Sequence, residues 1–254
     1  DHSILDLLTV WGFDIPLDKP DEFEKLSGVL ETVAAKTNKV FTPVSTNLRS
    51  LGEPFQVHWG DRGHGAALAA VAHICSSQLT EVRIASSFDF GNLFPWGSHP
   101  FLDPLFSSTN LSIVHDGIAW SRVDKTRLIA DHAEALASVH VCHKLDSAHN
   151  CSRCAKCIRT MITIDCLGSR QRASSFDWSA YELSTLAPVL ISSALDRAFF
   201  SDIERAAIAA ARHDIRQFIK RSERYSRWMR PVPGRMLKSA LARCYARMVE
   251  NWSA

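Results

Sequence analysis

Long hydrophobic runs are missing from this sequence of 254 residues: none reaches the roughly 20 apolar residues that a membrane-spanning helix requires. Its first residues, DHSILDLLTVWGFD, have neither the basic region nor the small-residue cleavage site of a signal peptide. An excess of one charge is also lacking, because 29 lysines and arginines nearly balance 27 aspartates and glutamates. We therefore expect a cytoplasmic protein without a membrane partner, whose overall field does not attract nucleic acid.

Charge is less evenly spread near the end of the sequence. From residue 201 onward, 12 lysines and arginines stand against five aspartates and glutamates. A solvated helical face explains this surplus best, and a surface for nucleic acid or an acidic partner is the less favoured interpretation. The overall composition, 46% hydrophobic and 22% charged, is that of a globular chain able to bury a core.

Apolar runs and helical periodicity alternate in the first part of the chain. Four short apolar runs predict strands, and two stretches with apolar residues three or four positions apart predict helices. A third helix is expected after Ser121, since Ser121 and Asp124 have the spacing of a capping box. This alternation is typical of an α/β fold with a parallel sheet covered on both faces. The strands are expected at residues 4–10, 39–44, 81–85 and 111–114, and the first two helices at 21–36 and 64–74.

Further along the chain the pattern changes to helices alone. We predict two parts, an α/β nucleotide-binding-like domain at residues 1–168 and a helical C-terminal extension at residues 169–254. The helices of the extension carry apolar stripes that need a partner, which predicts that they pack on the α/β domain. Ser201 and Glu204 are the expected cap of the second helix. These helices are expected at residues 177–195, 201–220 and 235–249.

Polar or glycine-containing segments follow several of the predicted strands. In open parallel sheets ligands bind outside the carboxyl ends of the strands, so we place a substrate or nucleotide there. Arg49 has a guanidinium that can clamp a carboxylate or phosphate, Ser86 can recognise adenine or ribose, and Trp96 can stack on a base. Each residue also has a structural alternative: a surface ion pair for Arg49, the end of a strand for Ser86, and packing on the core for Trp96. The candidate binding residues are Gly12, Asp14, Arg49, Ser86, Ser87, Asp89, Trp96 and His99.

The seven cysteines include a cluster of four within sixteen residues. Without a signal peptide, such clustering is typical of a metal site in a reducing compartment. Four thiolates suit the closed tetrahedron of a structural zinc, and Asn150 and Ser152 suit the tight turn between them. An iron–sulfur cluster and unliganded thiols are the alternatives. The predicted metal ligands are Cys142, Cys151, Cys154 and Cys157.

Residues 142–161 contain the pattern Cys-x8-Cys-x2-Cys-x2-Cys and resemble the zinc loop of the 7-cyano-7-deazaguanine synthases of queuosine biosynthesis and their uncharacterised relatives. Segments in the same order upstream, such as HGAAL at residues 64–68 and the strand before Asp89, extend the likeness over residues 4–165. The resemblance implies the PP-loop ATP pyrophosphatase superfamily, its adenine-nucleotide hydrolase-like (HUP) fold, and ATP with magnesium. It also implies that Lys125 is a catalytic residue that neutralises phosphate charge.

The Ser-Gly-Gly-x-Asp-Ser loop that holds pyrophosphate in that superfamily is absent from the sequence. We expect this loop either upstream of Asp1 in a longer chain or lost. The resemblance implies an ATP-dependent enzyme that adenylates a small carboxylate or modified base and forms an amide or nitrile. The alternatives are a non-catalytic zinc-containing relative, serving as a binding or scaffold subunit, and a tRNA-thiolation-type enzyme. A small-molecule acid is the expected partner, and a homodimer or a partner subunit stays open.

Overall fold

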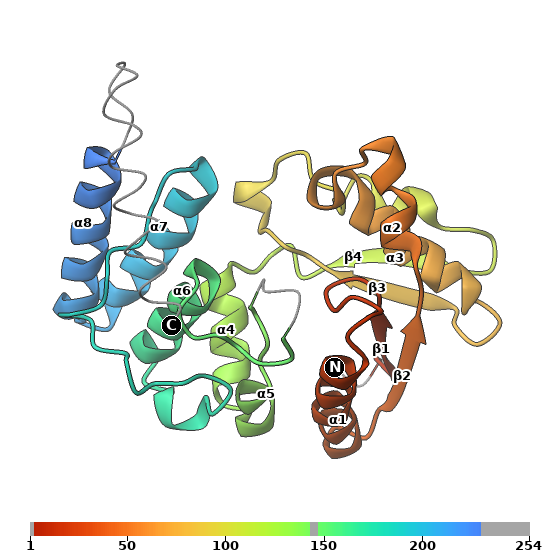
Figure 1. Cartoon of the computed structure of the whole chain (residues 1–254), viewed down its shortest axis with the longest axis horizontal. Helices are drawn as coiled ribbons and strands as arrows, with labels where there is room; N and C mark the ends of the chain where they lie inside the picture. The colour runs from red at the N-terminus through yellow and green to blue at the C-terminus, as the bar shows by residue number, and fades with distance from the viewer. Residues whose placement is uncertain (1–2, 143–146, 230–254) are drawn as a thin grey trace.

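Two pairs of parallel strands form the first half of the protein (Figure 1). This computed structural model describes residues 3–142 and 147–229. All four strands lie within two residues of their predicted positions, and α3 has the predicted bounds, because local apolar patterns are strong in this region. In chain order the elements of this half are β1 (Asp6–Trp11), α1 (Pro20–Lys36), β2 (Val40–Ser45), α2 (Leu48–Leu51), α3 (His64–Ile74), β3 (Glu81–Ala85) and β4 (Ser112–Asp116).

The strands pair as β1 with β2 and β3 with β4, both in parallel. Within the described part of the chain these are two separate two-stranded sheets, whereas the alternating pattern predicted one sheet. A sequence pattern indicates where strands lie but not which strand edges meet, which explains the difference. The protein is therefore α/β with short parallel sheets. The registers run from Asp6 opposite Val40 to Trp11 opposite Ser45, and from Glu81 opposite Ser112 to Ala85 opposite Asp116.

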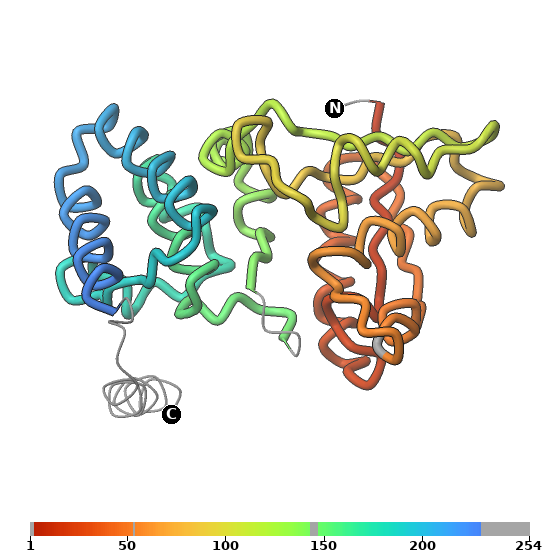
Figure 2. The backbone as a smooth tube through the Cα atoms, turned by 90° about the horizontal axis from the view of Figure 1, so that it is seen from above, coloured from red at the N-terminus to blue at the C-terminus, as the bar shows by residue number. Residues whose placement is uncertain are grey.

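Helices make up the second half, and in Figure 2 the teal and blue helices lie at the opposite end of the molecule from the red first strands. The first of these helices begins with both hydrogen bonds of the predicted Ser121–Asp124 capping box, which confirms that prediction. Among the described helices, none is long and apolar enough to cross a membrane. They are α4 (Arg122–Ala130), α5 (Ala133–Ala137), α6 (Ala155–Cys166), α7 (Ala194–Ala209) and α8 (His213–Trp228).

One hydrophobic core joins α4, α6, α7 and α8. Val123, Met161, Ile203 and Phe218, one from each helix, are at most 4% exposed. α7 and α8 thus pack with α4 and α6, and among the described residues no strand contributes to this core. That the later helices cover the sheets stays a prediction. This core contains residues on both sides of position 168, and the division there stays a prediction.

Residues 177–193 form a loop, so the helix predicted at 177–195 is wrong. Arg221 of α8 donates to the Ser184 carbonyl at 2.7 Å, and the Ser226 hydroxyl accepts from the Ile191 N–H at 2.7 Å. Pro188 also has no N–H to give to a helix. The backbone of this loop therefore finds partners on α8 instead of within a helix of its own.

The single helix predicted at residues 201–220 is also wrong, because the chain breaks between α7 and α8. The helix cap is a capping box of Ser193 and Asp196, so the predicted cap at Ser201 lies inside α7. Ala211, with φ +53°, ends the first helix, and Arg212 then binds Asp165 of α6. This break depends on a contact between distant segments. The helix predicted at residues 235–249 lies outside the described residues.

Candidate metal centre and a neighbouring cationic cavity

The sulfurs of the four clustered cysteines all lie within 4.8 Å of one another. The Cys157 sulfur is 3.4 Å from that of Cys154 and 3.9 Å from that of Cys151. A tetrahedral zinc with Zn–S bonds of about 2.3 Å holds its sulfurs about 3.8 Å apart, so the observed spacing fits such an ion. Cys142, Cys151, Cys154 and Cys157 can therefore hold a metal ion such as zinc.

Asn150 joins the two segments that carry these sulfurs. Its Oδ1 accepts hydrogen bonds from the N–H groups of Val141 and Cys142, at 2.9 and 3.2 Å. Its Nδ2 donates to the carbonyl oxygens of Val139 and Ser175, at 2.7 and 3.1 Å. One amide side chain therefore holds the segment with Cys142 against the turn that leads to the other three cysteines.

The turn itself is ordered by backbone and side-chain contacts. Ser152 has a φ of +56°, and its hydroxyl accepts from the Asp177 N–H at 2.8 Å. The hydrogen bond with Cys154, followed by burial and the charges of the neighbouring thiols, raises the pKa of Cys157 far above its usual range. Thiols this crowded resist ionisation until a cation binds them, and a coordinating metal deprotonates a thiol outright. The chemistry of the four side chains therefore also fits a metal.

Lys125 extends from α4 to the carboxyl end of β3. Its Nζ donates to the carbonyl and hydroxyl oxygens of Ser86, at 2.8 and 3.2 Å. Burial lowers the pKa of Lys125, and the charge of Arg122 lowers it further, while Asp89 and Asp116 oppose both effects. The structure therefore brings Lys125, Ser86 and Asp89 together at the edge of the sheet where parallel strands bind ligands.

The loop after β3 is held in place by its own side chains. Ser86 is buried, and Asp89 accepts two hydrogen bonds from the Asn92 amide, at 2.9 and 3.0 Å. The Ser87 carbonyl accepts from Arg122 Nη2 at 3.2 Å. Two cationic residues of α4 therefore fix this loop, and both do so through neutral oxygens.

Gly12, Asp14 and Arg49 lie at the carboxyl ends of the other pair, β1 and β2. Gly12 has a φ of +102°, and a Cβ there would lie 1.9 Å from the Thr46 carbonyl oxygen, so only glycine fits. Arg49 donates to the carbonyl of Phe13, between the other two candidates. The predicted residues are thus brought together, but this guanidinium already binds the backbone, and its role as a ligand clamp stays a prediction.

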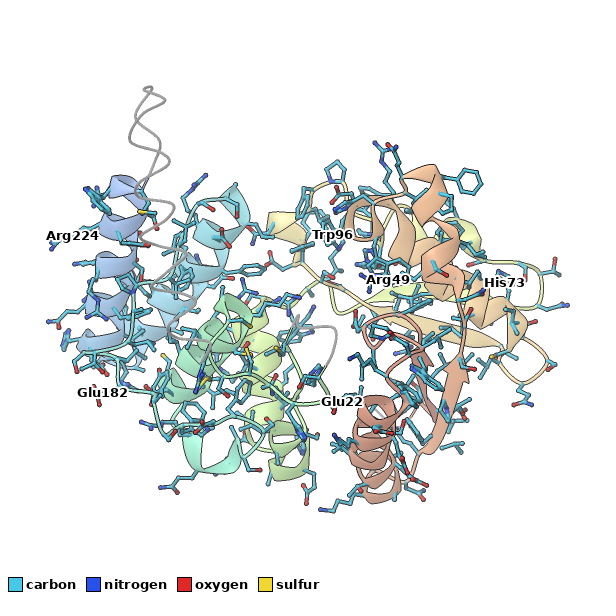
Figure 3. All side chains as sticks on the ribbon, in the orientation of Figure 1. Glu22, Arg49, His73, Trp96, Glu182 and Arg224 are labelled. Carbon is cyan, nitrogen blue, oxygen red and sulfur yellow. The ribbon has the colours of Figure 1, made fainter. Side chains whose placement is uncertain are left out.

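Trp96, labelled in Figure 3, lies in the long loop between β3 and β4 (residues 86–111) and packs among aromatic side chains. Its ring centroid lies 5.7 Å from that of His64, 5.8 Å from Phe88 and 5.5 Å from Phe94. A Cβ on Gly60 would approach the indole to 2.7 Å. Trp96 therefore fills space as its structural alternative predicts, and stacking on a base stays a prediction.

His99 belongs to a buried network that the sequence did not indicate. Its N–H donates to Asp103 Oδ1 at 3.1 Å, while the other carboxylate oxygen accepts from Ser98 Oγ at 2.6 Å and lies 2.7 Å from His115 Nδ1. Asp103 is fully buried. Since the hydroxyl and the ring share one carboxylate oxygen, the network fastens the long loop to β4.

Two arginines beside Lys125 complete a cationic cavity that the sequence did not indicate either. The Arg159 guanidinium of α6 lies 3.9 Å, and that of Arg122 5.6 Å, from the ring centroid of Phe199 in α7. With Lys125 they line a cavity of about 220 Å³. Burial and then the charge of Arg122 lower the pKa of Arg159 to about 10. No sequence signal could show this, because the residues come from three helices.

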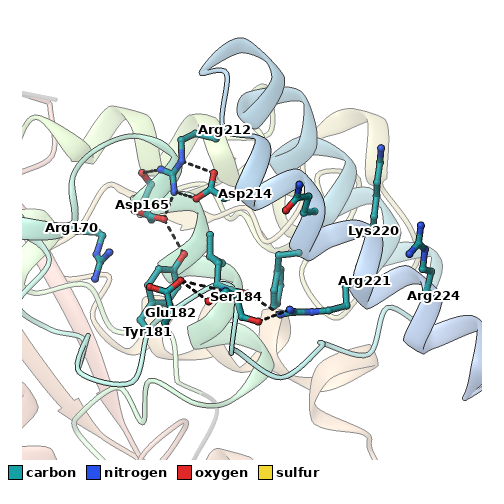
Figure 4. A pocket seen from close by; sticks show the side chains of 13 residues that line it. Asp165, Arg170, Tyr181, Glu182, Ser184, Arg212, Asp214, Lys220, Arg221 and Arg224 are labelled. Carbon is teal, nitrogen blue, oxygen red and sulfur yellow. Dashed lines mark hydrogen bonds and ion pairs between the residues drawn. The ribbon is translucent and has the colours of Figure 1, made fainter.

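A second cavity, of about 450 Å³, lies between α8 and the loop at residues 181–184 (Figure 4). Within it Arg212 binds the carboxylates of Asp165 and Asp214, at 2.6 and 2.7 Å. Arg221 is held by carbonyl oxygens of the loop. Two aspartates and a glutamate line this cavity among its cations. An anion bound there would meet these carboxylates, which makes the cavity the weaker candidate for such a ligand.

Comparisons with known proteins add no further constraint. No family model, no curated protein and no solved structure matches the chain. The metal centre and the cationic cavity therefore rest on the geometry of the described residues.

Proposed function

We propose that this protein uses ATP to adenylate a small carboxylate or modified base and converts the activated group to an amide or nitrile. One observation carries this: the half-buried ammonium of Lys125 lies at the carboxyl end of β3, against Ser86 and near Asp89. A nucleotide bound across the ends of parallel strands would bring its phosphates to such a cation.

The surroundings of Lys125 favour an anionic ligand. Within the described residues its hydrogen-bond acceptors are two neutral oxygens of Ser86. A phosphate oxygen would supply the full negative charge that these oxygens lack, and such charge-assisted hydrogen bonds are roughly twice as strong as neutral ones. During adenylation, negative charge develops on the departing pyrophosphate, and a fixed cation stabilises that charge.

The two parallel pairs fit the outer parts of one doubly wound sheet of the adenine-nucleotide hydrolase-like type. Parallel sheets of two strands are unusual, because such sheets are normally larger and covered on both faces. One more strand between the pairs would join them and end at the same edge as Lys125. A pyrophosphate-binding Ser-Gly-Gly-x-Asp-Ser loop on that strand would have to come from outside these 254 residues, which contain none.

Zinc, in this proposal, is structural. It would be held by Cys142, Cys151, Cys154 and Cys157, and with four sulfur ligands no coordination position remains for water. The ion would anchor the start of α6, which carries Arg159 and packs on α4. The metal centre would thereby fix the place of Lys125.

Calorimetry with AMP and ATP tests the proposed nucleotide site. We expect both nucleotides to bind weakly and about equally, since the donors for the β- and γ-phosphates are missing. Lys125→Ala should weaken both about tenfold, a loss of about 1.4 kcal/mol. Lys36→Ala, which removes an exposed lysine 3.7 Å from Glu134, should leave binding unchanged.

Two outcomes would contradict this placement. One is nucleotide binding that Lys125→Ala leaves intact. The other is cleavage of ATP to AMP and pyrophosphate by the 254 residues alone, because the phosphate site would then lie elsewhere.

The missing Ser-Gly-Gly loop favours a second candidate, a non-catalytic zinc-containing relative that binds a partner. The two candidates differ in how a longer chain carrying that loop would behave. Release of pyrophosphate that depends on an added acid supports the enzyme, and its absence across a panel of acids supports the binding subunit.

A further inference from the structure

Two arginines from different helices lie over a single aromatic ring. Arg159 comes from α6 and Arg122 from the first turn of α4, and the ring is Phe199 of α7. The carbon at the centre of each guanidinium is 3.9 Å and 5.6 Å, respectively, from the ring centroid. The ring face attracts both cations and so holds two like charges side by side.

This pair of charges is not neutralised by a carboxylate in the described part of the chain. Arg122 donates one hydrogen bond, to the neutral carbonyl of Ser87 at 3.2 Å, and no ion pair involves Arg159 there. Asp196 attracts Arg159, but no ion pair between them is formed in this part of the chain, and one oxygen of the Asp196 carboxylate accepts the hydrogen bonds of the Ser193 cap, at 2.7 and 3.0 Å. Arg122 is exposed to solvent, and Arg159 is partly exposed. A ligand can therefore reach the charges that the protein leaves unpaired.

The cavity in front of the arginines has a second, different wall. The arginines and Lys125 supply charge, and apolar side chains make up much of the remaining lining, with Ile129, Val139 and Ile203 among them. Among the residues that the structure describes, no aspartate or glutamate lines the cavity, and its volume is about 220 Å³. Concave sites that combine an apolar wall with a few charged groups bind small molecules, and guanidinium groups match the two oxygens of a carboxylate or phosphate.

We propose that Arg122 and Arg159 form a subsite for the oxyanion group, carboxylate or phosphate, of a small organic acid whose compact apolar body fills the cavity. Its identification as the acid-substrate site of an adenylating enzyme rests on the proposed function. Binding of the oxyanion itself does not.

Arg159 has one competing role, as a counter-charge for the metal centre. It lies two residues after Cys157, and the charge of Cys154 acts on it. A zinc ion with four thiolates carries a net charge of −2, which a nearby guanidinium would offset. If that were its main task, replacing Arg159 would weaken metal retention and leave the binding of acids unchanged.

Calorimetry on the zinc-loaded chain at low salt tests the subsite with three probes of similar size: benzoate, phenyl phosphate and neutral benzyl alcohol. Arg122→Gln and Arg159→Gln should each weaken the preferred acid at least tenfold and leave benzyl alcohol unchanged. Arg127→Gln is the matched control, since Arg127 is on α4, pairs with Asp124 at 2.6 Å and does not line the cavity. Zinc content and the unfolding midpoint are measured for every variant. Preference for benzoate or phenyl phosphate identifies the oxyanion as carboxylate or phosphate.

The subsite is overturned if neither acid binds more tightly than benzyl alcohol, or if both glutamine variants bind acids like the parent. Loss of zinc from Arg159→Gln with unchanged acid binding would assign Arg159 to the metal centre instead. Arg122 is exposed, so Arg122→Gln keeps the test decisive even if the other variant fails to fold. A protein that binds benzoate but no nucleotide would refute the proposed ATP chemistry and leave the subsite intact.

Discussion

Replacing Asn150 with alanine should destabilise the metal centre and the fold around it. The side chain makes four hydrogen bonds to backbone groups of residues 139, 141, 142 and 175. Each such bond contributes roughly 0.5–1.5 kcal/mol net, so their joint loss from this half-buried position should cost about 3 kcal/mol. In a protein of this size that corresponds to a fall of about 6–12 °C in the unfolding midpoint.

Urea unfolding of the zinc-loaded protein measures this effect, with Asn150→Asp as the matched variant. Aspartate keeps the acceptor for Val141 and Cys142 but cannot donate to Val139 and Ser175, so an intermediate loss is expected. Both variants should also lose zinc to a chelator at a lower concentration than the parent does, since Cys142 is less firmly held. An unfolding free energy of Asn150→Ala within about 0.5 kcal/mol of the parent would refute this reasoning, because surface substitutions have effects of that size.

Three further perturbations have definite expected outcomes. Gly12→Ala should lower the unfolding free energy by at least about 1–3 kcal/mol, because φ is +102° and the new Cβ would meet Thr46. Its control is Gly28→Ala on α1, where a Cβ would meet open space, and this change should raise the unfolding free energy by up to about 1 kcal/mol. Asp103→Ala should cost about 3 kcal/mol in urea unfolding, since it leaves buried partners without their acceptor, and a loss under about 1 kcal/mol would show the network to be dispensable. Burial lowers the pKa of Lys125, so as the pH rises the folded state loses the Lys125 proton at a lower pH than the unfolded state does. The unfolding free energy should therefore increase with pH between the lowered pKa and the usual value of 10.5. Lys125→Met should abolish this increase. If the unfolding free energy of the variant depends on pH as steeply as that of the parent, the prediction is wrong.

Local patterns were enough to predict the strands, the first helices and the cluster of four cysteines that could hold a metal. Each of these depends on residues close in sequence: apolar runs for the strands, the pair Ser121 and Asp124 for the start of α4, and two-residue spacings for the cysteines. Such signals do not depend on the rest of the fold. The pairing of strands into two sheets was not predicted, because it depends on edges far apart in the chain.

The errors share one physical cause, which is contact between distant segments. The loop at residues 177–193 has helical periodicity, yet Arg221 and Ser226 of α8 satisfy its backbone groups. The cationic cavity was missed for the same reason, since Arg122 and Arg159 meet only through Phe199 of a third helix. No spacing in the sequence shows that meeting.

The identity of the metal bound by the freshly purified protein tests the four-cysteine centre most directly. It also tests the proposal that this centre anchors α6, which packs on the helix that carries Lys125. Elemental analysis should give one zinc per chain, and X-ray absorption should show four sulfur ligands at about 2.3 Å. Cys154→Ala should lose the metal and unfold at a lower urea concentration than the parent. Iron in place of zinc would contradict the structural zinc and favour the tRNA-thiolation alternative, and a chain purified without any metal would contradict the centre altogether.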